Sequence, residues 1–350
     1  MALHWKVIWH WLYKRLSKMN KAIRKLVLFF YRLFKMSEEI QFIPDSKIIY
    51  YDEVSPLSES RNWGLDLCEI DEAWRLTKGA GIKVAILDTG ICKHEDLDGA
   101  WSENLVFNCS QDDNWEDKQS SHGTHVAGIV GARANNVGVV GIAPECTIIP
   151  IKVLNNNGGG RYSNIIDGIR LAISPHVDAD IITMSLGASS PGPSELHDII
   201  KEATSKGKII LAAAGNDSGP VNYPACYDEV IAVAAVDEHG DFAKFTSSGA
   251  QIDSLGPGVN IYSTLIGNKY GLMSGTSQAC PFIAGLCALI LAYTRSNPDK
   301  PQIKNYEDMM VALAKLSDET KYVKMEGEKR WGFGLPKLAN RNLETLLQGQ

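Results

Sequence analysis

Apolar segments alternate with helical patterns from about residue 63 onward. Fully apolar runs, typical of buried strands, predict strands at 83–88, 147–153, 180–184, 208–213 and 230–236. Apolar residues at helical spacing predict helices at 122–133, 162–174, 194–206, 276–293 and 305–316. Apolar strands that alternate with helices indicate an α/β fold, a mainly parallel twisted sheet with helices on both faces. We therefore expect one α/β domain over residues 63–350, with functional side chains at the carboxyl ends of its strands.

Residues 1–36 follow a different pattern. They contain no Gly or Pro, and they carry nine Lys or Arg and no acidic residue. Their apolar residues recur at spacings of three and four, which predicts a basic amphipathic helix: Trp9, Leu12, Leu16, Met19, Ile23, Leu26, Phe30 and Leu33. The absence of acids favours binding to an anionic membrane surface. The same spacing is also a heptad seam, so packing on the rest of the chain or pairing in a homodimer is the alternative. Residues 37–62 are polar and predict a linker or a short prosegment.

Charge and cysteine content narrow the class of protein. The net charge is −6, and because residues 1–36 contribute +9, the other 314 residues carry −15. An acidic body argues against nucleic acid as a partner. The seven cysteines are odd in number and form no C-x-x-C pair, which indicates free thiols in a reducing cytoplasm. The N-terminus has no secretory signal pattern. We expect a cytoplasmic protein, with peripheral attachment to the inner face of the membrane through residues 1–36 as the open question.

Residues 274–285 read S-G-T-S-Q-A-C-P-F-I-A-G, a glycine turn that leads into a long apolar helix. Ser277 would lie at the N-terminus of that helix, where free N–H groups and the helix dipole favour negative charge. A serine in that position is a candidate nucleophile, although a capping role is the commoner case. Three upstream residues strengthen the first interpretation. Asp88 ends a predicted strand, His122 begins a predicted helix, and Asn216 follows another strand.

These residues belong to four motifs, in order I-L-D-T-G (86–90), H-G-T-H-V-A-G (122–128), A-A-G-N (213–216) and G-T-S-Q-A-C-P (275–281). Together they resemble the subtilisin-like serine protease family, and most of all the bacterial intracellular subtilisins. The resemblance implies a serine endopeptidase with Ser277 as nucleophile, His122 as base, Asp88 as its orienting partner and Asn216 in the oxyanion hole. Two alternatives are kept. One is a dedicated leader-peptide or maturation protease, and the other is a membrane-recruited, non-catalytic binding protein on the same fold.

The resemblance also implies a site for an extended peptide substrate. One wall would be Gly158, Gly159 and Gly160 followed by Tyr162, and the other Ser185, Leu186 and Gly187. Asn222 would lie at the base of the pocket for the residue that precedes the cleaved bond. Tyr223-Pro224 falls where the family has a cis peptide. Gln278 departs from the family pattern, which usually has methionine after the serine.

Two further features are implied by the resemblance. A calcium ion would be bound by the side chains of Asp96 and Asn135 and by the carbonyls of Arg133, Val137 and Val139, with a metal-free turn as the alternative. The segment 40–45, I-Q-F-I-P-D, resembles a short prosegment of intracellular subtilisins. Its residues Phe42, Ile43 and Pro44 would occupy the cleft and resist cleavage, and a generic linker is the alternative. His125 forms H-x-x-H with His122, but no third ligand is evident, which argues against a metal site. The resemblance implies that His125 is structural.

Overall fold

The computed structural model describes residues 39–41, 50–52, 59–318, 331–338 and 343. The predicted basic helix at 1–36 and the prosegment residues Phe42, Ile43 and Pro44 lie outside the described residues. The chain divides into two compact units, residues 1–39 and 40–350. The proposed boundary between linker and protease domain, at residue 63, stays a prediction.

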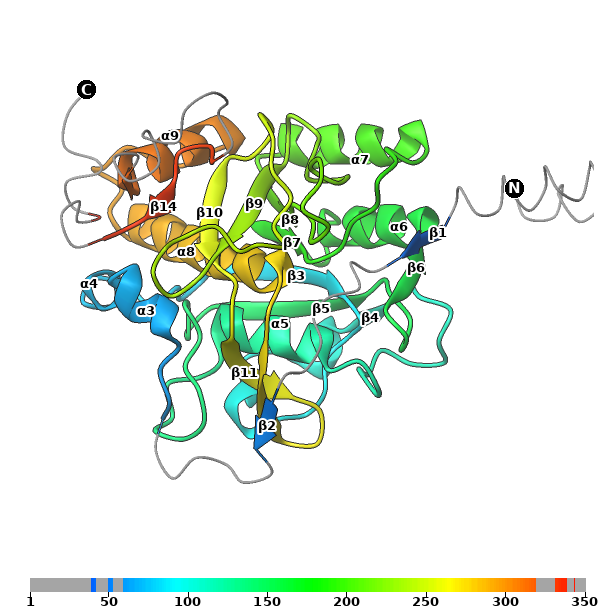
Figure 1. The fold of residues 1–350 in the computed structure, drawn as a ribbon, viewed down its shortest axis with the longest axis horizontal. Coiled ribbons are helices and arrows are strands. Elements are labelled where there is room, and N and C mark those ends of the chain that lie inside the picture. Colours follow the sequence, from blue (N-terminus) through cyan, green and yellow to red (C-terminus); the bar gives the residue numbers. More distant parts are fainter. Residues whose placement is uncertain (1–38, 42–49, 53–58, 319–330, 339–342, 344–350) are drawn as a thin grey trace, which may run out of the picture. The chain divides into compact units, whose positions relative to one another are not determined.

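A seven-stranded sheet forms the centre of the larger unit, and every strand pairing in it is parallel (Figure 1). In spatial order its strands are β10 (Ser254–Pro257), β9 (Ile231–Val236), β8 (Ile209–Ala213), β7 (Ile181–Met184), β3 (Lys83–Asp88), β5 (Thr147–Lys152) and β4 (Phe107–Asn108). The mainly parallel α/β sheet predicted from the sequence is therefore confirmed. The apolar runs predicted five of the seven strands within one or two residues of their ends. β10 was missed because Gly and Pro interrupt its short apolar segment.

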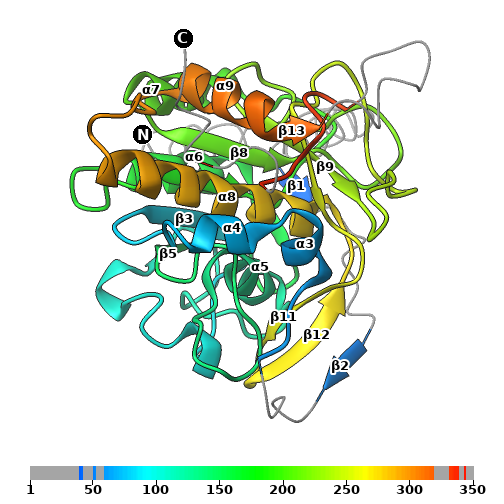
Figure 2. The same cartoon turned by 90° about the vertical axis from the view of Figure 1, so that its left-hand side faces the viewer.

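Helices cover both faces of this sheet. α5 (His122–Gly131) and α8 (Thr276–Ser296) contact each other and the sheet, whereas α6 (Tyr162–Ala172) and α7 (Ser194–Ser205) form the other pair. α9 (Tyr306–Leu316) contacts β8 and the short strand β14 (Leu335–Pro336), which pairs with β13 (Ser317–Asp318). Figure 2 shows α8 running along the sheet beside β3. All five helices were predicted from the sequence, with ends that differ by no more than three residues.

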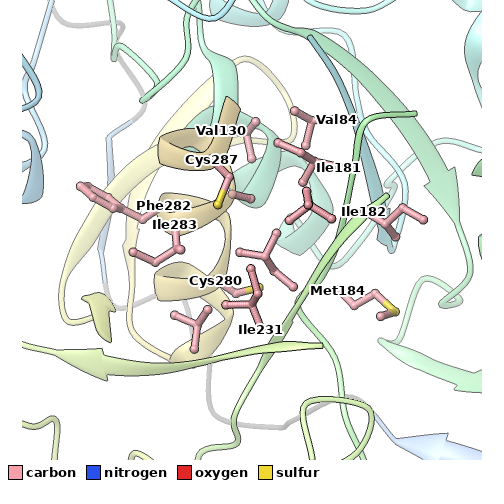
Figure 3. Close-up of a cluster of buried hydrophobic side chains, with 14 of the residues drawn as sticks. Val84, Val130, Ile181, Ile182, Met184, Ile231, Cys280, Phe282, Ile283 and Cys287 are labelled. Carbon is pink, nitrogen blue, oxygen red and sulfur yellow. The ribbon is translucent and has the colours of Figure 1, made fainter. Parts of the chain in front are cut away.

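The side chains packed around β7 show which strand positions face α5 and α8. Val84 and Ile181 lie together with Val130 of α5 and with Cys280, Ile283 and Cys287 of α8 (Figure 3). Ile182 and Met184 lie on the opposite side of β7. Because successive side chains of a strand alternate between faces, Asp88 lies on the same face as Val84, toward α5. α8 is long and apolar enough to cross a membrane, but its apolar 18-residue window is completely buried here, as in the core helix of a folded domain.

Smaller elements surround the sheet. They are the helices α3 (Trp63–Leu67) and α4 (Ile70–Trp74), the 3-10 turns η1 (Glu95–Leu97) and η2 (Glu103–Leu105), and the antiparallel hairpin of β11 (Ile261–Leu265) and β12 (Lys269–Met273). Two upstream strands join this framework. β2 (Tyr50–Asp52) pairs antiparallel with β12, and β1 (Glu39–Gln41) pairs with β6 (Gly159–Arg161).

Candidate active site

Asp88 and His122 form a buried hydrogen-bonded pair at the carboxyl end of β3. Nδ1 of His122 lies 2.7 Å from Oδ1 of Asp88, and both side chains are at most 2% exposed. Oδ1 of Asp88 also accepts a hydrogen bond from the backbone N–H of Thr89 at 2.7 Å. A carboxylate can only accept here, so Nδ1 of His122 carries its hydrogen and Nε2 is the basic nitrogen. This tautomer is the one that a general base requires.

Two neighbours that no sequence motif identifies, Asp117 and Lys152, support this pair. Asp117 Oδ1 accepts from the N–H of Ser121 at 3.1 Å, and Oδ2 accepts from the hydroxyl of Thr124 at 3.1 Å, which ties the first turn of α5. Burial raises the pKa of the Asp117 carboxyl. Lys152 pairs in register with Asp88 across β3 and β5 and is completely buried; its Nζ lies 3.3 Å from Asp112. A lysine at the end of an otherwise apolar strand is the feature of the sequence that could have identified Lys152.

Ser277 is the second residue of α8 and is fully buried. Its hydroxyl donates to the backbone oxygen of Ser185 at 3.3 Å, and the hydroxyl of Ser185 donates to the backbone oxygen of Ser277 at 2.8 Å. These reciprocal bonds hold segment 185–187 against the N-terminus of α8. The predicted helix-start position of Ser277 is therefore the one observed.

Asn216 presents a hydrogen-bond donor beside Ser277. Its Oδ1 accepts from the N–H and the hydroxyl of Thr276, at 2.8 and 3.0 Å, which fixes the orientation of the amide. Its Nδ2 is buried and has no hydrogen-bond partner among the residues that the structure describes. A Cβ atom built on Gly275 would lie 3.1 Å from this Nδ2 and 3.6 Å from the backbone nitrogen of Ser277. Two donors that converge on one small space can bind a developing oxyanion.

The glycines predicted to bind substrate lie at a sheet edge. Gly158 has a φ of +78°, a conformation that favours glycine, and Gly159 and Gly160 begin β6. The partner of β6 is β1 of the same chain. Tyr162 begins α6, is buried, and donates its hydroxyl hydrogen to the backbone oxygen of Ser190 at 2.8 Å. β1 therefore pairs with β6 as an added strand, which is how an extended substrate is expected to pair with this edge.

Asn222 and its neighbour Tyr223 connect two segments near Ser277, one that contains Ala214 and one that contains Ala188. The N–H of Asn222 donates to the backbone oxygen of Ala214 at 2.8 Å, and the next residue, Tyr223, exchanges two backbone hydrogen bonds with Ala188. A Cβ atom built on Gly215 would lie 2.6 Å from Nδ2 of Asn222, so the amide lies under Gly215. Leu186 and Gly187 are buried on the opposite wall. The Tyr223-Pro224 bond is cis, which confirms that expectation.

The predicted calcium residues do lie together. However, Asn135 turns its Nδ2 toward Asp96 Oδ1 at 3.1 Å, and the N–H of Val139 donates to Asp96 Oδ2 at 2.6 Å. Oδ1 of Asn135 accepts from the N–H of Val137 at 3.0 Å, and the backbone oxygen of Arg133 accepts from the N–H of Asn135 at 3.0 Å. The oxygens of Asp96, Asn135 and Arg133 that would bind a cation therefore accept hydrogen bonds from the protein instead. In the observed orientation Asn135 presents a donor to Asp96, so calcium could bind here only after this amide turns. No group of three or more His, Cys, Asp or Glu within the described ranges could hold a metal.

His125 is structural in this arrangement. It is completely buried, and its Nε2 lies 3.0 Å from the backbone oxygen of Ile261 and 3.2 Å from that of Gly271. Burial lowers its pKa to about 3, so the ring is neutral at pH 7. Its contacts join α5 to the β11–β12 hairpin rather than to the reacting groups.

Comparison with known proteins agrees with this architecture. The model of the Subtilase family matches residues 79–327, well over half of the chain. An intracellular serine protease of Paenibacillus polymyxa is 36% identical over 303 residues, which cover 83% of this chain and 90% of that protein. Subtilisin E of Bacillus subtilis is 43% identical over 220 residues, 61% of this chain and 56% of subtilisin E. The minor extracellular protease Epr of Bacillus subtilis is 36% identical over 278 residues, and the match spans 78% of this chain and 40% of Epr.

The fold and these relatives place the chain among the subtilisin-type serine proteases. The chain belongs to the subtilase family. Proteases of this class act on peptide or protein substrates, as the sequence analysis expected. Aligned with members such as Epr and subtilisin E, the chain spans about half of the length of the relative or less.

Proposed function

We propose that this protein cleaves peptide bonds with Asp88, His122 and Ser277 as a catalytic triad and with Asn216 as an oxyanion donor. Ser277 Oγ attacks the substrate carbonyl carbon while Nε2 of His122 takes its proton, and the carbonyl electron pair moves onto the oxygen. The N–H of Ser277 and Nδ2 of Asn216 hold that oxyanion. His122 then gives the proton to the leaving nitrogen as the C–N bond breaks, and water hydrolyses the acyl-enzyme by the reverse roles.

The observation that carries this proposal is the buried donor of Asn216, which converges with the Ser277 backbone on one space beside the nucleophile. A purely structural asparagine would pair both ends of its amide, because an unpaired buried donor costs about 1–3 kcal/mol. The 2.7 Å pair between His122 and Asp88 supports the same proposal, since it sets the tautomer that a base needs.

The test is the loss of one hydroxyl. Ser277→Ala should abolish peptide hydrolysis and labelling by a fluorophosphonate while it leaves the melting curve almost unchanged. Ser296→Ala, at the exposed far end of the same helix, is the matched control and should keep both activities. Hydrolysis at the parent rate by Ser277→Ala would exclude the proposed triad. A folded parent protein that never reacts with the label would favour the non-catalytic alternative. A peptide-library profile limited to one sequence would favour the dedicated maturation protease.

We further infer that the segment after β1 is an inhibitory prosegment that the enzyme removes itself. β1 pairs with β6, the edge expected to hold substrate, and Phe42, Ile43 and Pro44 follow β1 directly in the sequence. A strand in that position competes with substrate at the high effective concentration of an intramolecular ligand. Proline fixes φ and has no N–H, so it opposes the extended geometry that cleavage requires.

Two truncations separate cleft occupancy from the loss of β2. A chain that starts at residue 46 removes β1 and Pro44 but keeps β2, and a chain that starts at Ser58 removes both strands. Both should be active while the full-length chain is nearly inactive. Pro44→Ala should self-process faster than the parent, with Pro56→Ala as the control in the same segment. Equal activity of all three chain lengths would mean that residues 37–62 are only a linker.

The remaining proposals concern location, association and calcium. The likeness to an intracellular serine protease favours the cytoplasm, and the basic pattern of residues 1–36 favours an anionic membrane surface over a homodimer. Calcium at the Asp96 loop stays a prediction from the family likeness. Binding there would require the Asn135 amide to turn so that Oδ1 replaces Nδ2.

A further inference from the structure

Gln278 follows the proposed nucleophile and is completely buried. Its Nε2 donates to the sulfur of Met273 at 3.8 Å, a weak hydrogen bond because a thioether is a poor acceptor. Its Oε1 has no hydrogen-bond partner within the described part of the chain. A buried amide oxygen left in this state costs free energy, so its position calls for a physical reason.

The unpaired oxygen lies at the proposed oxyanion site. A Cβ atom built on Gly275 would lie 3.0 Å from Oε1 of Gln278, 3.1 Å from Nδ2 of Asn216 and 3.6 Å from the nitrogen of Ser277. Within the described residues, Oε1 of Gln278 and Nδ2 of Asn216 border this space without a hydrogen bond to each other. Once an oxyanion occupies this space, the same Oε1 would repel it.

We propose that Gln278 turns its amide during the reaction, so that Nε2 donates a third hydrogen bond to the oxyanion and Oε1 faces Met273. This inference rests on the proposed serine mechanism. The turn occurs about the terminal torsion of the side chain, whose energy profile is broad. It gives up only the weak bond to sulfur and gains a hydrogen bond to a full negative charge, and charge-assisted bonds are the stronger kind. Gln278 would then be a catalytic residue, because it touches the reacting oxygen.

The variant that tests this role is Gln278→Met, which keeps an unbranched side chain of similar length and removes the N–H donor. We expect kcat to fall about tenfold while KM changes less than twofold, since the bond forms only in the transition state. Gln278→Glu, nearly identical in shape but unable to donate when ionised, should be slower still. The matched control is Gln251→Met, at an exposed position, which should leave kcat unchanged.

A second measurement does not depend on turnover. A peptidyl trifluoromethyl ketone forms a tetrahedral adduct with the serine, and fluorine NMR reports the pKa of its oxyanion. Removal of a donor should raise that pKa by about one unit in Gln278→Met, the equivalent of a tenfold loss. A purely structural role for Gln278 would change the melting temperature without moving this pKa.

The outcomes separate this inference from the proposal on which it rests. If Ser277→Ala is inactive but Gln278→Met is as fast as the parent, or its adduct pKa is unchanged, the triad stands and the third donor is wrong. If Gln278→Met does not fold, the comparison between Gln278→Glu and the parent decides, through the same adduct pKa. If Ser277 forms no adduct, the serine mechanism itself has failed.

Discussion

A half-buried carboxyl group, Asp253, should make the folded protein less stable at alkaline pH. Asp253 precedes β10, and its Oδ2 accepts from the N–H of Ala232 at 2.9 Å. Burial raises the pKa of this carboxyl to about 7, and the nearby charge of Asp228 adds to the shift. The folded state therefore favours the protonated form. This contribution to stability is fully present below the ordinary pKa of about 3.8 and is lost as pH rises through the folded value of about 7.

The shift sets the size of the effect. It corresponds to about three pKa units, and each unit is equivalent to about 1.4 kcal/mol, so the charged carboxyl costs at most about 4 kcal/mol above pH 8. Asp253→Asn keeps an oxygen that can accept from Ala232 and removes the charge. We expect this variant to have a larger free energy of unfolding than the parent at pH 8, and a similar one at pH 4.

Urea unfolding at the two pH values measures the difference, in a Ser277→Ala background to prevent self-digestion. Asp299→Asn, which removes an exposed carboxylate, is the control and should change the free energy of unfolding by less than about 0.5 kcal/mol at either pH. If Asp253→Asn destabilises the protein equally at pH 4 and pH 8, the carboxylate is not penalised by burial and the reasoning is refuted.

Three further predictions concern the site and the termini. Asn216→Ala should lower kcat by about 10²–10³, a magnitude known from subtilisin itself, and an unchanged kcat in steady-state kinetics would remove Asn216 from the mechanism. If calcium binds the Asp96 loop, saturation at a hundred times Kd adds about 2.7 kcal/mol, so chelator should lower the melting temperature of the parent but not of Asn135→Ala; a chelator-insensitive parent contradicts the site. Full-length protein should float with anionic vesicles, less so in high salt, and deletion of 1–36 should abolish this; a dimer that ignores vesicles supports the coiled-coil alternative.

The sequence predicted the central sheet and its helices because their patterns are local. A run such as residues 83–88 is apolar throughout, and a strand buried on both faces needs nothing else to be recognised. The β11–β12 hairpin was not predicted, because its buried positions include polar residues. Ser263 donates to the backbone oxygen of His125 and Thr264 to that of Thr124, each at 2.8 Å, so α5 satisfies both hydroxyls. Such long-range bonds leave no periodic signal in the sequence.

For the candidate site, the sequence likewise predicted the residues but not the orientation of their side chains. Motifs identified Asp88, His122, Ser277 and Asn216 by residue type and order, but they do not say which end of an amide is left to act. In the structure Thr276 fixes the orientation of the Asn216 amide. The N–H and the hydroxyl of Thr276 both donate to Oδ1 of Asn216, which turns Nδ2 toward Ser277. The threonine before the serine thus orients a donor that lies 60 residues away in the sequence. Among the residues that the structure describes, none bonds to the amide oxygen of Gln278, and this contrast between a fixed and an unfixed amide oxygen underlies the proposed turn of Gln278.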